Sequence, residues 1–415
     1  MDRLIFHVDV NSAFLSWEAA RRVKEGGEDL RLIPACIGGD PERRTSVVLA
    51  KSIPAKAFGI RTGEPISMAL RKCPDLVIAP SDFRLYEECS EAFMDICRRF
   101  APVVEKFSID ECFLDMTGTG HMYPDPIATA HTIKNTIRDT LGFTVNIGVG
   151  SNKLLAKTAG DFEKPDKVHS LFTHELKEKF WPLPVGQLLS VGATTAKKLE
   201  RLDIYTIGDL AACPLSSLQA VLGNKMGQML HEYANGIDPS PVLTRAPEAK
   251  GYSVSTTLEE NVTTAEQADH ILLALADSVT ARMRSDGAKA GCVSVTLRST
   301  DFKNRSHQLT LEEATDITTQ IYRHARALFR ELWDGKTALR LLGLSLSDIT
   351  RDGSEQLSLF EDEEKDRARK IDRAMDAIRS KYGSATIMRG AVKEDAPNVG
   401  KKYKAHLDRI REEDP

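Results

Sequence analysis

Residues 4–14 read LIFHVDVNSAF and residues 106–116 read KFSIDECFLDM, and both stretches set acidic residues among apolar, strand-like ones. The acids are Asp9 in the first stretch and the adjacent pair Asp110 and Glu111 in the second. Strands fix their side chains on a rigid sheet, so two paired strands could bring the three carboxylates together. Adjacent strand residues point to opposite faces, and therefore Asp110 and Glu111 can share a site only where their strand begins, bends or bulges.

The acidic residues and their arrangement suit a metal site. Three carboxylates from two segments can hold two divalent cations, which activate an attacking oxygen and stabilise a leaving oxygen in phosphoryl transfer. Oxygen ligands favour Mg²⁺, with Mn²⁺ as a substitute, over zinc. The competing interpretation is that each acid is a turn or strand-end residue paired with lysine or arginine. That interpretation accounts readily for a single acid, but less readily for three acids that all lie among apolar, strand-like residues.

The length and composition indicate a globular chain of several domains. Its 415 residues exceed one ordinary domain, and a typical domain size of about 150 residues predicts three or four units. No apolar run reaches the roughly 18 to 20 residues that a membrane span needs. The start Asp2-Arg3 leads directly into a strand, unlike an export signal. We therefore expect no membrane association and a cytoplasmic location.

Cysteine usage and net charge narrow the class of protein. The seven cysteines are odd in number and scattered, and no two form a C-x-x-C pair. This usage is typical of reduced thiols in a cytosolic protein. The formal net charge of -4 shows none of the basic excess common in nucleic-acid-binding proteins. Binding to nucleic acid would therefore have to depend on local basic patches.

The region from residue 3 to about 165 is predicted to be mixed α+β. Apolar patterning predicts strands at residues 3–10, 32–39, 45–50, 103–111, 112–116 and 143–150. Helical spacing predicts helices at residues 18–27, 81–100 and 126–142. The strands around Asp110 and Glu111 are expected to form an antiparallel pair that holds these acids near its turn.

Beyond Pro165 the sequence changes to short helices with small residues. Residues 191–211, VGATTAKKLERLDIYTIGDLA, follow the pattern of a helix-hairpin-helix. In that motif the turn amides and helix N-termini face a phosphate backbone. A related glycine turn recurs in residues 222–236, with Lys225 in the loop. A plain pair of antiparallel helices remains the alternative for either segment alone.

The C-terminal part begins with a predicted linker at residues 242–249, which are poor in apolar residues. Residues 250–348 predict one βαββαβ domain, in which residues 301–305, DFKNR, form a locally basic turn between two strands. After Ile349 the chain is polar and charged. It carries a predicted helix at roughly 362–383 with no role that the sequence reveals, and a tail beyond Gly390 that is expected to be disordered.

Four motifs in this order resemble the Y-family translesion DNA polymerases of the DinB and UmuC type, from residue 3 to about 348. The motifs are HVDVNSAFLS at 7–16, KFSIDECFLDM at 106–116, VGSNKLLAKTAGDFEKPD at 149–166 and the helix-hairpin-helix at 191–211. The resemblance implies an α+β multidomain fold of the right-hand polymerase type. The implied parts are a palm (1–10 and 77–165), small fingers (11–76), a helical thumb carrying helix-hairpin-helix motifs (166–241), a linker (242–249), a βαββαβ little finger (250–348) and a C-terminal tail (349–415).

The resemblance also implies roles for individual residues of the site. Asp9, Asp110 and Glu111 are similar in position to the family's catalytic metal ligands, and the carbonyl of Val10 to a further ligand. Phe14 is similar to the steric gate that excludes a ribose 2′-hydroxyl; from the sequence alone it would be a core residue. The implied nucleotide-binding residues are Asn11, Ser12, Ala13, Phe14, Lys56 and Lys164. Alone, the two lysines would be surface charges.

Two departures from the family's pattern concern the nucleotide. DinB-type relatives often place Tyr and Arg where this chain has Ile53 and Lys56. The lysine keeps the charge but loses bidentate geometry, and the isoleucine loses a hydroxyl donor. Val47 and Leu49 stand where relatives are often smaller. The sequence does not show how these four residues affect nucleotide binding or the room above the templating base.

The expected partners are primer-template DNA, dNTP, the bacterial beta sliding clamp and accessory SOS proteins, and the chain is expected to be a monomer. The residues QLSLF resemble the family's clamp-binding peptide, with Gln356, Leu357, Leu359 and Phe360 as its contacts. A polar flank suits a peptide that enters a hydrophobic groove. Cationic residues near Lys289 and in the hairpins are expected to face DNA, the candidate contacts being Gly192, Lys197, Lys225, Arg298, Lys303 and Arg305.

The function hypothesis is a low-fidelity, DNA-templated DNA polymerase acting in translesion synthesis, DNA repair and the SOS response. Nucleotidyl transfer from dNTP to a primer 3′-hydroxyl would use two Mg²⁺ ions. One alternative is a non-catalytic DNA-repair scaffold of the same fold, which would be expected to lose the acids. Another is a palm-type nucleotidyl cyclase, which would act on nucleotide without primer. Lesion specificity, error spectrum and dependence on accessory subunits stay open.

Overall fold

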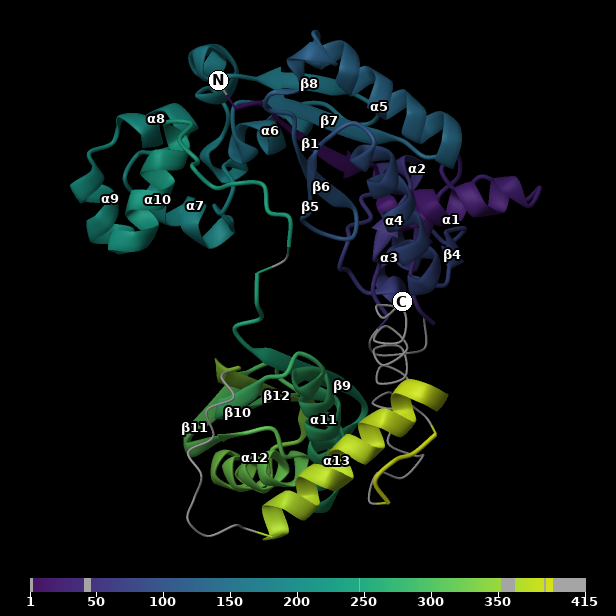
Figure 1. Cartoon of the computed structure of the whole chain (residues 1–415), viewed down its shortest axis with the longest axis vertical. Helices are drawn as coiled ribbons and strands as arrows, with labels where there is room; N and C mark the ends of the chain where they lie inside the picture. The colour runs from purple at the N-terminus through teal and green to yellow at the C-terminus, as the bar shows by residue number, and fades with distance from the viewer. Residues whose placement is uncertain (1–2, 41–45, 246, 352–362, 384–385, 391–415) are drawn as a thin grey trace. The chain divides into compact units, whose positions relative to one another are not determined.

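The computed structural model describes residues 3–40, 46–245, 247–351, 363–383 and 386–390. Its internal contacts divide the chain into two compact units (Figure 1). Of the described residues, 3–40 and 46–245 form unit 1, and 247–351, 363–383 and 386–390 form unit 2. No helix within the described residues is long and apolar enough to cross a membrane.

The largest sheet of unit 1 has the strand order β5-β6-β1-β7-β8. Its strands are β1 (Ile5–Val10), β5 (Val103–Lys106), β6 (Glu111–Asp115), β7 (Val145–Gly150) and β8 (Val168–Leu171). The central strand β1 is antiparallel to β6 and to β7 and is buried along its whole length. β5 and β6 form the predicted antiparallel pair, which is confirmed. The sequence analysis did not predict β8.

Helices cover this sheet and enclose a large apolar core. The helices that contribute to this core are α1 (Ala13–Lys24), α4 (Phe83–Arg98) and α5 (Pro126–Leu141). Helix α6 (Lys153–Gly160) also packs against the sheet but places its buried leucines in a different apolar cluster, and η1 (Thr119–His121) is a short helix after β6. Helix α6 approaches β7 so closely that a Cβ on Gly148 would lie 1.9 Å from the carbonyl oxygen of Ala156. Glycine at position 148 is therefore required for this packing, which brings α6 toward the end of the sheet that carries the acids.

A smaller sheet with the order β3-β2-β4 lies in residues 35–79. It consists of β2 (Ala35–Ile37), β3 (Ala50–Lys51) and β4 (Val77–Ala79), with helices α2 (Ile53–Ala57) and α3 (Ile66–Lys72). The strand predicted at 45–50 was wrong over most of its length. Val47 forms an isolated bridge with Pro65, and the Val48 amide donates to the Glu64 carbonyl at 2.9 Å. Residues 46–48 thus bond to the 63–66 loop, while the Leu49 amide donates to the Ile37 carbonyl of β2 at 2.8 Å.

The rest of unit 1 is helical around its own apolar core. Its helices are η2 (Thr173–Glu175), η3 (Leu176–Phe180), η4 (Val185–Gln187), α7 (Ala193–Glu200), α8 (Ile207–Ala212), α9 (Leu215–Leu222) and α10 (Asn224–Ala234). α7 and α8 form the two helices predicted for the helix-hairpin-helix. Thr206 and Asp209 form a capping box that fixes where α8 begins.

Unit 2 has the predicted βαββαβ order, which is confirmed. Its elements are β9 (Tyr252–Val262), α11 (Ala265–Ser285), β10 (Lys289–Ser299), β11 (Asn304–Thr315), α12 (Thr318–Leu332) and β12 (Leu339–Thr350). The antiparallel sheet has the order β11-β10-β12-β9, and α11 and α12 pack on it around one apolar core. Most residues of the edge strand β11 are exposed.

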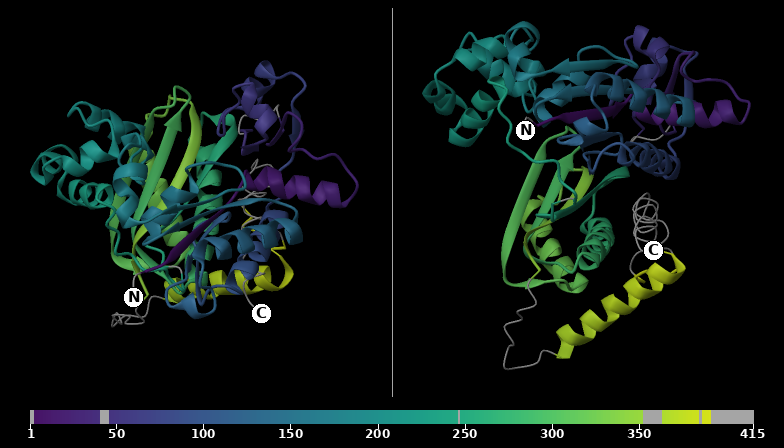
Figure 2. Two further views of the ribbon diagram at one scale, coloured as in Figure 1. Left: turned by 90° about the horizontal axis from the view of Figure 1, so that it is seen from above. Right: turned by 45° about the horizontal axis from the view of Figure 1, so that its top comes forward.

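A further helix, α13 (Glu363–Tyr382), confirms the helix predicted at roughly 362–383 and belongs to unit 2 (Figure 2). Helix α12 begins after Ile317, whose side chain cannot cap it. The buried carboxylate of Asp372 accepts the Thr318 amide at 2.9 Å instead. A residue of α13 therefore supplies the N-terminal cap of α12, although the two lie 54 residues apart in the chain.

Replacing Asp372 with alanine is expected to destabilise unit 2. The change removes the α12 cap and leaves Arg284 without one of its acidic partners. Breaking a buried ion pair on one side costs about 3–5 kcal/mol. Hydrogen exchange by mass spectrometry should show faster exchange in residues 318–322 and in α13. The matched control is Lys370→Ala, an exposed residue of the same helix; equal protection of 318–322 in both variants would contradict the cap.

Candidate active site

Strand register places the three acids at the same end of the large sheet. Asp9, near the end of β1, lies directly opposite Glu111, the first residue of β6. Asp110 lies in the turn before β6, where its carbonyl accepts the Val10 amide at 3.0 Å. Its carboxylate accepts a hydrogen bond from the Ser108 hydroxyl at 2.6 Å. Asp110 thus lies before the regular part of β6. This position agrees with the expectation that Asp110 and Glu111 can share a site only where their strand begins, bends or bulges.

Glu111 is held by two cationic or polar neighbours. His7 Nε2 lies 3.1 Å from Glu111 Oε2, and the Lys157 ammonium group donates to the same oxygen. Burial opposes ionisation of Glu111, but the hydrogen bonds of His7 and Lys157 outweigh it and lower its pKa to about 2. The Glu111 carboxylate is therefore ionised and oriented at neutral pH.

Asp9 has a different electrostatic environment. Burial raises the pKa of this carboxyl, while the ammonium group of Lys164 hydrogen-bonds to it and lowers the pKa in part. Lys164 also lies 2.8 Å from Asp161. Burial lowers the pKa of Lys164, but the charges of Asp9 and Asp161 outweigh this and raise it. Within the described ranges, no three His, Cys, Asp or Glu side chains are grouped closely enough to hold a metal ion by themselves.

His7 and Lys157 are site residues that the sequence analysis missed. His7 lies two residues before Asp9, so the alternation of strand β1 places both on one face. Lys157 lies in the quoted motif at 149–166, on α6. Strand alternation could have identified His7, and the quoted motif at 149–166 could have identified Lys157. The pairing of Lys157 with Glu111, however, depends on how closely α6 packs against β7.

The turn between β1 and α1 is fixed mainly by Asn11. Its side-chain oxygen accepts from the Thr144 hydroxyl at 3.0 Å and from the Asp166 amide at 2.9 Å, and its amide nitrogen donates to Asn146. Its backbone N–H donates to the Thr144 carbonyl. Ser12 follows in the left-handed region, with φ 49°. The turn places the amides of residues 12–14 at the start of α1, where helix amides lack internal partners.

Phe14 lies at the margin of the main core, half-buried. Its ring stacks on that of buried Tyr86 with centroids 4.5 Å apart and planes at 21°. The rings of Trp17 and Phe83 lie 5.9 and 6.2 Å away. Phe14 is thus held in one orientation by an aromatic cluster and keeps part of its surface accessible.

The residues that depart from the family's pattern lie around the smaller sheet. Ile53 is 64% exposed at the start of α2, and Lys56 is exposed on the same helix. Burial and the charge of Lys56 lower the pKa of neighbouring Lys51. Leu49 packs against the main core. Helix α2 therefore presents one exposed apolar and one exposed cationic side chain.

The candidate DNA contacts lie in both units. In unit 1, Gly192 precedes α7, Lys197 lies in the last turn of α7, and Lys225 is the second residue of α10. In unit 2, Arg298 Nε donates to Asn304 Oδ1 at 2.7 Å, and Lys303 pairs with Asp301 at 2.8 Å.

The hairpin between β10 and β11 carries further polar and aromatic groups. Lys303 and Arg305 border a cavity of about 220 Å³ beside Trp333. Phe302, which the sequence analysis did not single out, is 64% exposed at the hairpin turn. Its ring lies 5.0 Å from the Arg340 guanidinium carbon. The hairpin therefore combines cations with an exposed ring.

Comparison with known proteins shows the relationships of the chain. Residues 8–161 match the impB/mucB/samB family, 186–238 match the DNA polymerase-iota thumb domain, and 249–359 match the impB/mucB/samB family C-terminal domain. A DNA polymerase IV of Clostridium acetobutylicum is 43% identical over 395 residues, covering 95% of this chain and 99% of that protein. DNA polymerase IV of Alkaliphilus oremlandii is 37% identical, with 94% and 99% coverage.

A solved structure shares the fold. A Y-family DNA polymerase chimera of Dbh and Dpo4 has a TM-score of 0.71 at 21% identity, covering 84% of this chain and 100% of its own. The right-hand fold with palm, fingers, helical thumb and little finger, together with the matched families, defines a DNA-directed DNA polymerase. The chain belongs to the bacterial Y-family polymerases of the DinB type.

Proposed function

We propose that the chain extends DNA primers past damaged bases by transferring nucleotides from dNTP to the primer 3′-hydroxyl. The observation that carries this proposal is the β1–β6 register, which sets Asp9 opposite Glu111 with Asp110 in the adjoining turn. Curated relatives named DNA polymerase IV over nearly the whole chain support it. Primer extension on undamaged and lesion-bearing templates tests it.

Divalent metal use follows from the family, and the chemistry of the donor atoms at the site suits such an ion. The donor set consists of carboxylate oxygens, and Glu111 is ionised through His7 and Lys157. Asp9, Asp110, Glu111 and the Val10 carbonyl would hold the metal. We propose two Mg²⁺ ions, with Mn²⁺ as a substitute, which when bound would lower the pKa of the primer hydroxyl and neutralise phosphate charge.

The chain's own residues bind and select the nucleotide. We propose that Lys164, Lys56 and the amides from Asn11 to Phe14 hold the triphosphate. Lys164 already pairs with Asp9, so it stands beside the acids. The Phe14 ring, supported by Tyr86, lies under the sugar and excludes a 2′-hydroxyl. A non-catalytic scaffold or a nucleotidyl cyclase is not favoured, because all three acids are present with a thumb and a little finger.

We propose the following parts for the right hand. They are a palm at 1–10 and 77–165, fingers at 11–76, a thumb at 166–241, a linker at 242–249, a little finger at 250–348 and a tail from 349. The family match for the thumb at 186–238 and the β9–β12 domain support this division. The proposed DNA contacts are Gly192, Lys197, Lys225, Arg298, Lys303 and Arg305. We further propose a cytoplasmic monomer that acts in the SOS response with accessory proteins.

The clamp-binding peptide QLSLF at 356–360 lies outside the described residues, and its role is a proposal from sequence. Deleting Gln356 to Phe360 should leave basal primer extension unchanged and remove its stimulation by the beta clamp, because the peptide would supply the anchor that enters the clamp groove. Primer extension with and without clamp measures this. Deleting residues 396–400 provides a length-matched control; stimulation equal to wild type after the QLSLF deletion would place the contact elsewhere.

A further inference from the structure

Helix α13 is attached to unit 2 mainly through charged side chains. Of its three buried residues, Asp372, Met375 and Arg379, only the methionine is apolar. Four arginines face four aspartates in this interface, namely Arg284, Arg369, Arg379 and Arg389 with Asp277, Asp316, Asp372 and Asp376. This network is balanced in charge and fixes the orientation of α13 on the domain.

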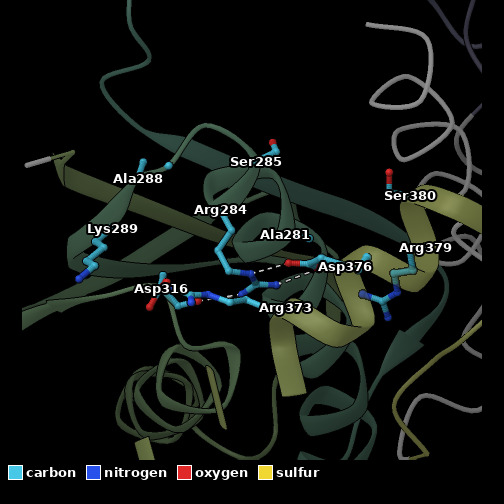
Figure 3. A pocket seen from close by; sticks show the side chains of 12 residues that line it. Ala281, Arg284, Ser285, Ala288, Lys289, Asp316, Arg373, Asp376, Arg379 and Ser380 are labelled. Atoms are coloured by element: carbon cyan, nitrogen blue, oxygen red, sulfur yellow. Dashed lines mark hydrogen bonds and ion pairs between the residues drawn. The ribbon is translucent and has the colours of Figure 1, made fainter. Parts of the chain in front are cut away.

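A pocket of about 540 Å³ lies between α13, the end of α11 and the start of β10 (Figure 3). Its volume falls within the roughly 300–1,000 Å³ range of small-molecule sites. Arg284 of α11 reaches toward Asp376 of α13 inside it, while Lys289 of β10 and Arg373 of α13 stand on its walls (Figure 3). The family match for the C-terminal domain ends at residue 359, so α13 adds one wall of this pocket beyond the matched region.

The lining of the pocket carries more positive than negative groups. Its cations are Arg284, Lys289, Arg373 and Arg379, and its acids are Asp316 and Asp376. Both acids are already bound, since Arg284 Nε donates to Asp376 at 2.7 Å and Arg369 Nε donates to Asp316 at 3.2 Å. Ser285 and Ser380 also line the pocket.

Arg373 lines the pocket but does not belong to the network of four arginines and four aspartates. It is exposed, and it forms no hydrogen bond or ion pair with any residue that the structure describes. A guanidinium group offers several donors in a planar fork that matches phosphate oxygens, and serine hydroxyls can add further donors. An anion in the pocket would therefore meet a cation whose donors are available.

We propose that this pocket binds a phosphate group, with Arg373 as its principal contact. The site lies in unit 2 and is distinct from the acidic residues of unit 1. Two sources share this chemistry: a phosphodiester of the DNA backbone and a free phosphate compound.

Titration calorimetry of the full chain with inorganic phosphate, in EDTA and at constant ionic strength, tests the proposal. Arg373→Gln should weaken binding at one site by about tenfold or more, as expected for the loss of a charge-assisted hydrogen bond. Arg367→Gln, an exposed arginine of the same helix that does not line the pocket, should bind like wild type. Absence of phosphate binding, or equal affinity in wild type and Arg373→Gln, would overturn the proposal.

Binding of single-stranded DNA at several salt concentrations separates the two sources. If the ligand is a backbone phosphate, Arg373→Gln should reduce the slope of log K against log salt by about 0.7. If the ligand is a free phosphate compound, the slope stays the same while phosphate affinity falls. Hydrogen exchange of residues 318–322 should match wild type in Arg373→Gln, which shows that α13 remains docked.

Discussion

Replacing both Asp110 and Glu111 with alanine should reduce the primer extension rate by at least about a thousandfold. Metal ions contribute several kcal/mol of transition-state charge stabilisation, and each 1.36 kcal/mol corresponds to a tenfold change in rate. The double variant removes two of the three carboxylates proposed to hold the ions. It also leaves Lys157 and His7 without the carboxylate that they orient. Single-turnover primer extension with Mg²⁺ measures the effect.

Asp115→Ala is the matched control for this experiment, because Asp115 lies at the opposite end of the same strand β6. It should retain extension near the wild-type rate. Primer-template binding by both variants, measured without nucleotide, checks that the fold and the DNA-binding surface are intact. Extension near the wild-type rate in the double variant would show that the acids are not the metal ligands.

Replacing Phe14 with alanine should raise ribonucleotide incorporation relative to deoxynucleotide incorporation by about a hundredfold. When a pocket distinguishes two substrates only by the steric effect of one hydroxyl group, the ratio of their kcat/KM values is roughly a hundred. The stack on Tyr86 keeps the Phe14 ring from moving aside. Without the ring, the space under the sugar could accept a 2′-hydroxyl. The ratio of kcat/KM for matched dNTP and rNTP measures the change.

Phe100→Ala controls for the loss of a ring, since Phe100 is also half-buried against the main core. It should affect stability more than sugar selection and should leave the deoxy-to-ribo ratio unchanged. An unchanged ratio in Phe14→Ala would refute the role of Phe14 as the steric gate.

Local sequence patterns were sufficient to predict most of the elements that carry the site. Strand β1 and the β5–β6 pair follow from apolar runs around Asp9 and around Asp110 and Glu111, and the alternation of faces placed Asp110 in a turn. The βαββαβ order of unit 2 follows from periodicities of two and 3.6 residues. These features depend on residues close together in sequence.

The features that were missed depend on contacts between distant residues. Lys157 meets Glu111 only because Gly148 lets α6 approach β7. Residues 46–48 look like part of a strand but bond to the 63–66 loop, because tertiary packing overrides the local strand preference. The contacts of α13 were not predicted either, because Asp372 and Thr318 lie far apart in sequence and no local pattern links them.

The cap that Asp372 provides to α12 has a consequence for exchanging little fingers between polymerases. A module cut at residue 359, where the family match ends, would contain α12 and Arg284 but would lack the helix that completes them. In such a transplanted domain, the N-terminus of α12 would lack its cap, and buried Arg284 would lack its acidic partners from α13. The exchangeable part therefore extends to about residue 390, and evolutionary shuffling of this domain would have to move α13 with it.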